Sequence, residues 1–167
     1  MPRGPATGTA CDCFISLDQV PGEAQDAAFA GAIEVLSWNW SASSRGDQVT
    51  GTAVRAAADV RHFKFQHLLD SATAGLWARC VTNVLIPNAV LTQRRAGGSS
   101  AQRFLEIRFK QVRIVDVALA MAEESPLPEE IVTFAFESVT LEYTPQSADG
   151  ASQSGRHSFN WMAGTAR

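Results

Sequence analysis

The sequence has little basic charge clustering, no long apolar run and few cysteines. Its 167 residues hold 14 Lys and Arg against 17 Asp and Glu, a formal net charge of −3, and the longest basic cluster is Arg94-Arg95. Nucleic-acid domains usually carry a basic patch that neutralises phosphates, so this composition excludes a generic nucleic-acid binder. No window approaches the roughly 18 apolar residues that cross a bilayer, and we expect no membrane insertion.

The three cysteines, Cys11, Cys13 and Cys80, are an odd number without metal-ligand spacing. This excludes a disulfide framework and a zinc site, and it predicts reduced thiols. Residues 1–10 contain one arginine and no apolar core, so we expect a flexible N-terminal tail rather than a signal peptide. The protein should therefore fold in the cytoplasm.

With 46% hydrophobic and 19% charged residues, the chain is apolar enough to fold as one domain. We expect that domain to span residues 11–162, followed by a short C-terminal tail at 163–167. The segment 41–58 holds almost no large apolar side chain. A structureless stretch of this length inside a compact domain is uncommon and usually functional.

Apolar residues alternate along most of the domain, which predicts a mainly β fold. Leu36, Trp38 and Trp40 share one phase, so both tryptophans should lie on one face of a strand and Asn39 on the other. Two long strands, 101–119 and 132–143, each change phase once midway. The slips, near Lys110-Gln111 and Glu137-Ser138, require a bulge or bend in each strand.

Strands that bend midway are what a sheet needs when it curls into a small barrel. A last strand at 157–162 could close it. One helix is expected after the strand at 63–69, capped by Asp70, Ser71 or Thr73. Its apolar stripe consists of Leu76, Trp77 and Cys80.

The sequence shows little that would support catalysis. His62 and His67 differ by an odd number of strand positions, so they point to opposite faces and cannot share a metal. No phosphate loop, dinucleotide fingerprint or nucleophile elbow is present. A dense acidic group lies near prolines, where a solvated turn is expected rather than an acid and base pair: Glu123, Glu124, Glu129 and Glu130. We therefore expect no enzyme, no cofactor and no metal.

Five segments, in order and at the right spacing, resemble the Hcp family of bacterial type VI secretion tube proteins, which are related in fold to phage tail-tube proteins. They are DCFISLDQVPGEAQD, IEVLSWNW with its paired tryptophans, DVRHFKFQHLLDSATAGLWARC, LTQRRAGG and FAFESVTLEYTPQSADG. Together they extend over nearly all of residues 12–162. The resemblance implies a two-sheet β-barrel with one short α-helix on its flank.

The resemblance further implies a structural protein whose six copies close into a ring, with rings stacking into a hollow tube. A contractile sheath on a baseplate would drive the tube, tipped by a VgrG-type spike protein, out of the cell. The lumen would carry or shield effector proteins. On this basis the protein is secreted without a signal peptide.

The family pattern also suggests where the functional surfaces lie. Asn39 matches a lumen-facing polar position between the tryptophans, and segment 41–58 resembles a loop that reaches the neighbouring ring. The charged residues expected in ring stacking are Arg45, Asp47, Arg55 and Asp59. The residues expected at the rim of the subunit interface are Arg61, Arg94, Arg95, Glu106, Arg108 and Glu142. Such exposed ion pairs would set register more than affinity.

A second interpretation is a monomeric β-barrel that holds a small apolar ligand inside, as lipocalin-like barrels do. Particle size distinguishes the two interpretations, because a ring contains about six chains whereas the ligand-binding barrel is a single chain. A third interpretation, a tube protein fused to a toxin, ranks last because the chain ends about five residues after the last predicted strand.

Overall fold

The computed structural model describes residues 11–44, 58–95, 102–121, 123, 125–145 and 155–164. The expected tail at 1–10, the residues 165–167 and most of the expected loop at 41–58 lie outside these ranges. The described elements are β1 (Cys11–Leu17), β2 (Ile33–Glu34), β3 (Ser37–Asn39), β4 (Ala42–Ser44), β5 (Ala58–Val60), β6 (Phe63–Leu68), α1 (Ala72–Thr82), β7 (Ile86–Arg95), β8 (Arg103–Ala120), β9 (Glu129–Ala135), β10 (Ser138–Tyr143) and β11 (His157–Met162).

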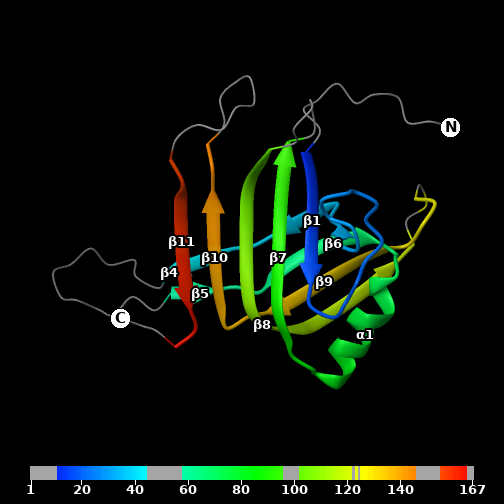
Figure 1. Cartoon of the computed structure of the whole chain (residues 1–167). Helices are drawn as coiled ribbons and strands as arrows, with labels where there is room; N and C mark the ends of the chain where they lie inside the picture. The colour runs from blue at the N-terminus through cyan, green and yellow to red at the C-terminus, as the bar shows by residue number, and fades with distance from the viewer. Residues whose placement is uncertain are drawn as a thin grey trace.

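Apart from β4 and β5, which pair with each other as a separate ribbon, the described strands form two antiparallel sheets that share β8. Sheet A has the order β2-β1-β7-β8-β10-β11, and sheet B has the order β8-β9-β6-β3. In Figure 1 the strands of sheet A stand upright, while β6 and β9 cross behind them. The mainly β, two-sheet fold with a helix on its flank is confirmed. Strand pairing does not close these sheets into a barrel among the described residues, and β11, the strand expected to close it, pairs only with β10.

The bend expected near Lys110-Gln111 is present in β8. Gln111 has a left-handed φ of 55°, and the strand passes there from its pairing with β10 to its pairing with β9. A second irregularity interrupts the β8 and β9 register between Ile114 and Asp116. These two kinks allow one strand to serve both sheets, because each extra residue bends the strand and increases its twist.

The expectation of one long bent strand at 132–143 is wrong. The chain leaves sheet B after β9, turns at Phe136 and Glu137, and enters sheet A as β10. The phase slip lies where the sequence predicts it, but it separates two strands in different sheets and does not bend one strand. Glu137 secures the turn by donating its backbone N–H to the Lys110 carbonyl over 3.0 Å.

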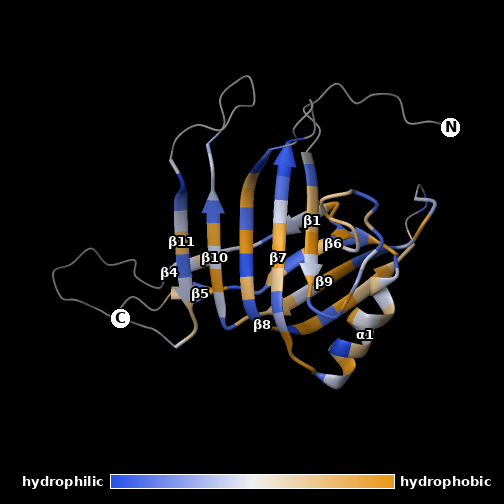
Figure 2. Cartoon of the chain, in the orientation of Figure 1, coloured by the Kyte–Doolittle hydropathy of each residue, from blue (hydrophilic) through white to orange (hydrophobic). Residues whose placement is uncertain are grey.

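Aromatic rings fill the space between the sheets. Phe63, Phe65, Phe109 and Phe134 are fully buried, and Phe109 lies 4.9 Å from Phe63 and 5.0 Å from Phe134 between ring centroids. Figure 2 shows the alternation of hydrophobic and hydrophilic residues along the strands that produces this core. Close-packed rings in edge and tilted contact are favourable beyond the area that they bury.

Residues 33–39 join the two ends of the strand path. β2 pairs with β1 and β3 pairs with β6, and no strand pairing links β2 to β3 among the described residues. Between them Val35 donates to the Cys13 carbonyl and Leu36 donates to the Gln66 carbonyl. The segment therefore switches sheets at this point, and Leu36 is 54% exposed rather than in phase with Trp38 as expected.

The helix α1 begins after a local cap. The Ala72 N–H donates to Asp70 Oδ1 over 2.9 Å, whereas Ser71, at the N-cap position, makes no capping hydrogen bond with its side chain. Of the expected apolar stripe, Leu76 is fully buried and Cys80 packs against the core, but Trp77 is 42% exposed. Trp77 uses its indole N–H instead, which donates to Glu130.

Glu130 overturns the expectation of a solvated acidic turn. It lies in β9, fully buried, with Oε2 2.7 Å from His67 Nε2 and Oε1 2.7 Å from Trp77 Nε1. His67 is also fully buried, so it is not an ordinary strand histidine. Asp70 Oδ1 lies 3.7 Å from His67 Nδ1, and burial raises the pKa of the Asp70 carboxyl. This polar cluster connects sheet B to α1.

Candidate functional surfaces

The described residues offer surfaces rather than a reaction centre. Within the described ranges, no three His, Cys, Asp or Glu side chains gather closely enough to hold a metal ion. No helix in the same ranges is long and apolar enough to span a membrane. The hollows in the surface lie over strand faces and between loops, so the candidate functional residues are those that line these faces.

The outer face of sheet B carries Asn39. Trp38 stacks on Phe63 with 5.7 Å between centroids, on the core side of β3, so the neighbouring Asn39 points away from the core and is exposed. Its cross-strand row is Asn39, Lys64, Thr133 and Asp116. Residues directly opposite share one face of a sheet, so these polar side chains line one wall together.

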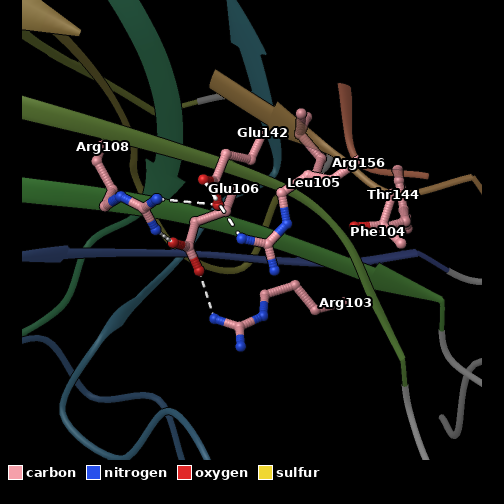
Figure 3. A pocket seen from close by; sticks show the side chains of 8 residues that line it. All are labelled: Arg103, Phe104, Leu105, Glu106, Arg108, Glu142, Thr144 and Arg156. Atoms are coloured by element: carbon pink, nitrogen blue, oxygen red, sulfur yellow. Dashed lines mark hydrogen bonds and ion pairs between the residues drawn. The ribbon is translucent and has the colours of Figure 1, made fainter. Parts of the chain in front are cut away.

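A network of ion pairs covers the outer face of sheet A, as Figure 3 shows. Glu106 on β8 lies directly opposite Glu142 on β10, where two like charges repel. Arg108 bridges them, bonding Glu106 through Nη1 and Glu142 through Nη2 at 2.9 Å. Arg103 adds a bond to Glu106, and Arg156 approaches Glu142 at 3.6 Å.

This network contains three of the residues that were expected at the rim of the subunit interface. Glu106, Arg108 and Glu142 were each expected at the rim of an interface, and the structure brings all three together within one subunit. With Arg103 and Arg156 the group holds three cations and two anions, a net charge of 3 − 2 = +1. Most of the charge is thus neutralised internally, while the outermost arginines remain more than 60% exposed.

Arg94 forms a clamp inside the subunit. Its guanidinium bonds Asp12 on β1 and Asp26 in the loop between β1 and β2. The same group lies 5.3 Å from the ring centroids of Phe14 and Phe29, which stack 4.6 Å apart. The hydrogen bond from Arg94 lowers the pKa of Asp26, and that bond raises the pKa of Arg94. Arg94 therefore fixes the loop to the sheet.

The remaining expected residues are placed only in part. Arg61 pairs with Asp59 at 3.1 Å, next to the short β4 and β5 ribbon, and Arg95 ends β7 with an exposed side chain. The other stacking residues, Arg45, Asp47 and Arg55, lie outside the described residues.

Large apolar side chains at two places on the surface were missed from the sequence. Leu36, Leu69 and Leu127 line a groove beside β2, and Tyr143, Phe159 and Met162 lie on β10 and β11. All six are between 38% and 54% exposed. Alternation gave no signal for the exposure of Tyr143 and Phe159, because a residue in core phase is exposed wherever the opposite layer ends.

Two curved sheets with a filled interior and polar outer faces define a mainly β protein with one flanking helix. The family described as "Type VI secretion system effector, Hcp" has a model that matches residues 14–143. That match spans most of the chain, and the protein belongs to the Hcp family of the type VI secretion system.

Individual relatives agree with this assignment. Protein hcp1 of Pseudomonas aeruginosa is 33% identical over 153 residues, which cover 91% of this chain and 94% of the relative. A type VI secretion system effector from Yersinia pestis is 30% identical with a TM-score of 0.75, covering 91% of this chain and 100% of the other. A further type six secretion system protein is 25% identical with a TM-score of 0.85, over 95% and 99% of the two chains.

Proposed function

We propose that this protein is the repeating subunit of the type VI secretion tube, with six copies in each ring and rings stacked into a hollow tube. The observation that carries the proposal is the Hcp family match over residues 14–143, joined to structural similarity over almost the whole chain. The subunit's role is mechanical and involves no catalysis. It folds in the cytoplasm and leaves the cell through the secretion system.

The outer face of sheet B is the surface that would line the lumen. The row of Asn39, Lys64, Thr133 and Asp116 is polar and carries one charge of each sign, so its net charge is zero. Such a wall would hold water and form no strong attachment to a passing protein. Effector proteins would travel inside, a VgrG-type spike would tip the tube, and a sheath on a baseplate would drive it.

The filled interior favours the tube over the second interpretation, a monomeric barrel with an apolar ligand. Four fully buried phenylalanines occupy the space where such a barrel would hold its ligand. Negative-stain imaging of the purified chain tests the proposal. Annular particles with a central hole are expected, and single small particles, matched by a monomeric mass in light scattering, would overturn it.

The loop assignment has its own experiment. Residues 45–56, which include Arg45, Asp47 and Arg55, are replaced by a short Gly-Ser linker that leaves Asp59 and its partner Arg61 unchanged. Rings should persist while their stacking into tubes is lost, as seen by electron microscopy. Normal stacks in this variant would remove the loop from the contact between rings.

A further inference from the structure

Sheet A ends in two unlike strands. Its order places β2 at one end and β11 at the other, so these strands are on opposite flanks of the subunit. In Figure 1, β11 stands at the left border of the described fold, well away from β1 and β6. Copies arranged side by side in one direction would therefore bring the β11 end of one subunit to the β2 end of the next.

The β2 end carries an apolar groove with acidic walls, which we call the β2 groove. Its exposed apolar residues are Leu36, Leu69 and Leu127, each between 38% and 54% exposed. The charged residues that line it are all acidic: Glu23, Glu34 and Asp70. A surface of this kind fits a partner that presents apolar side chains beside a cation.

No Lys or Arg is among the described residues that line the groove. Burial raises the pKa of Asp70 because it disfavours the charged carboxylate, and the negative charge of Glu23 also raises it, whereas the Ala72 N–H and His67 act in the opposite direction. A cation from a partner would relieve this cost. Leu69 and Asp70 are adjacent in the chain, so an apolar and a cationic contact would be made together.

The β11 end has the complementary surface, which we call the β11 flank. Tyr143, Phe159 and Met162 are 43% to 48% exposed there, with Tyr143 and Phe159 on one face of the β10 and β11 pair and Met162 on the other, so the flank is the edge of the sheet rather than one of its faces. Tyr143 faces His157 across the strand pair, and Arg156 precedes it with a side chain 68% exposed. Because the ion network beside it has a net charge of +1, this end of the sheet is apolar and basic where the other end is apolar and acidic.

From these two surfaces we infer that the β2 groove of one copy receives the β11 flank of a second copy, in a head-to-tail contact. The inference rests on the proposed function, since it names the surfaces by which the ring closes. The contact is heterologous, so it forms a ring when its rotation closes and a filament otherwise. A stable interface buries about 800 Å² per partner, more than these side chains supply, so they form the centre of a larger contact.

Two variants test the contact, each changing one surface. The groove variant carries Leu36→Ser and Leu127→Ser, and the flank variant carries Phe159→Ser and Met162→Ser. The matched control is Val81→Ser, which removes an apolar side chain that is 81% exposed on α1, away from both surfaces. Each protein is assessed by light scattering after size exclusion, with far-ultraviolet circular dichroism as the check that it folds.

Both variants should lose the ring and elute as monomers at concentrations where the wild type and the control are assembled. An equal mixture of the two variants should form dimers, because one intact groove and one intact flank remain between them. A flank variant that fails to fold is replaced by Met162→Ser alone, which lies at the end of β11.

The outcomes separate the inference from the function that it rests on. Rings in the wild type that survive in the groove variant would overturn the inference and leave the tube proposal standing. Monomeric variants whose mixture gives no dimer would overturn the head-to-tail pairing of these two surfaces. A wild type that stays monomeric at every concentration would overturn both.

Discussion

Replacing Glu130 with alanine should cost the fold far more than its acidic character suggests. The side chain is fully buried, and its two oxygens lie 2.7 Å from His67 Nε2 and 2.7 Å from Trp77 Nε1. Alanine leaves both of these donors without an acceptor. A fully buried polar group that loses its partner costs about 1 to 3 kcal/mol, which applies to His67. Trp77 is 42% exposed, so water can replace part of its lost bond, and we expect a total cost of about 2 to 4 kcal/mol.

The assay is urea or thermal unfolding at one fixed protein concentration, because assembly also changes apparent stability. A loss of about 3 kcal/mol lowers the Tm of a domain of this size by about 6 to 12 °C. The matched control is Glu129→Ala, the preceding residue of β9, which is half-buried and bonds Gln66 on the outer side of the sheet. If Glu130→Ala loses no more stability than this control, the assignment of Glu130 to a fixed buried cluster is refuted.

Two other changes probe the core and the Arg94 clamp. Phe134→Ala should cost about 3 to 5 kcal/mol in urea unfolding, whereas Ile131→Ala, 38% exposed on the same strand, should cost far less; equal losses would contradict the core assignment. The bond from Arg94 lowers the pKa of Asp26, so its stabilisation is present above the ordinary carboxyl pKa of about 4 and is lost as the pH falls through the lowered value. Asp26→Asn should therefore unfold more easily than the wild type at pH 7, with the gap in Tm closing below about pH 4; a gap independent of pH would exclude the clamp.

The curvature of the fold was predictable because it is encoded in local phase. A side-chain period of two cannot slip without a bulge, and the slip near Lys110-Gln111 corresponds to the left-handed backbone at Gln111. The position of the slip at Glu137-Ser138 was also predicted correctly. The sequence did not show that the chain changes sheets there. Phase reports that a strand is interrupted, and it does not report whether the next strand joins the same sheet.

The burial of Glu130 could have been found in the same pattern. Glu130 is in phase with Val132 and Phe134, just as His67 is in phase with Phe65 and both lie inside. Because Glu130 belongs to a dense acidic group near prolines, it was assigned to a solvated turn, and its place in the strand alternation was not used. Only the pairing of β6 with β9, which places His67 directly opposite Glu130, shows why a carboxylate is tolerated there.

The charged residues expected at the rim are mostly engaged within the subunit, which changes what can drive assembly. Arg94 bonds two aspartates, Arg108 bridges two glutamates and Arg61 pairs with Asp59. To meet a neighbour these groups would have to exchange one partner for another, and exposed pairs are worth only about 0 to 1 kcal/mol each. In the proposed ring, burial of apolar area, which contributes about 25 cal/mol per Å², would then be the main source of affinity between copies. The half-exposed side chains of the β2 groove and the β11 flank are where that area is available, with charge setting the direction in which copies meet.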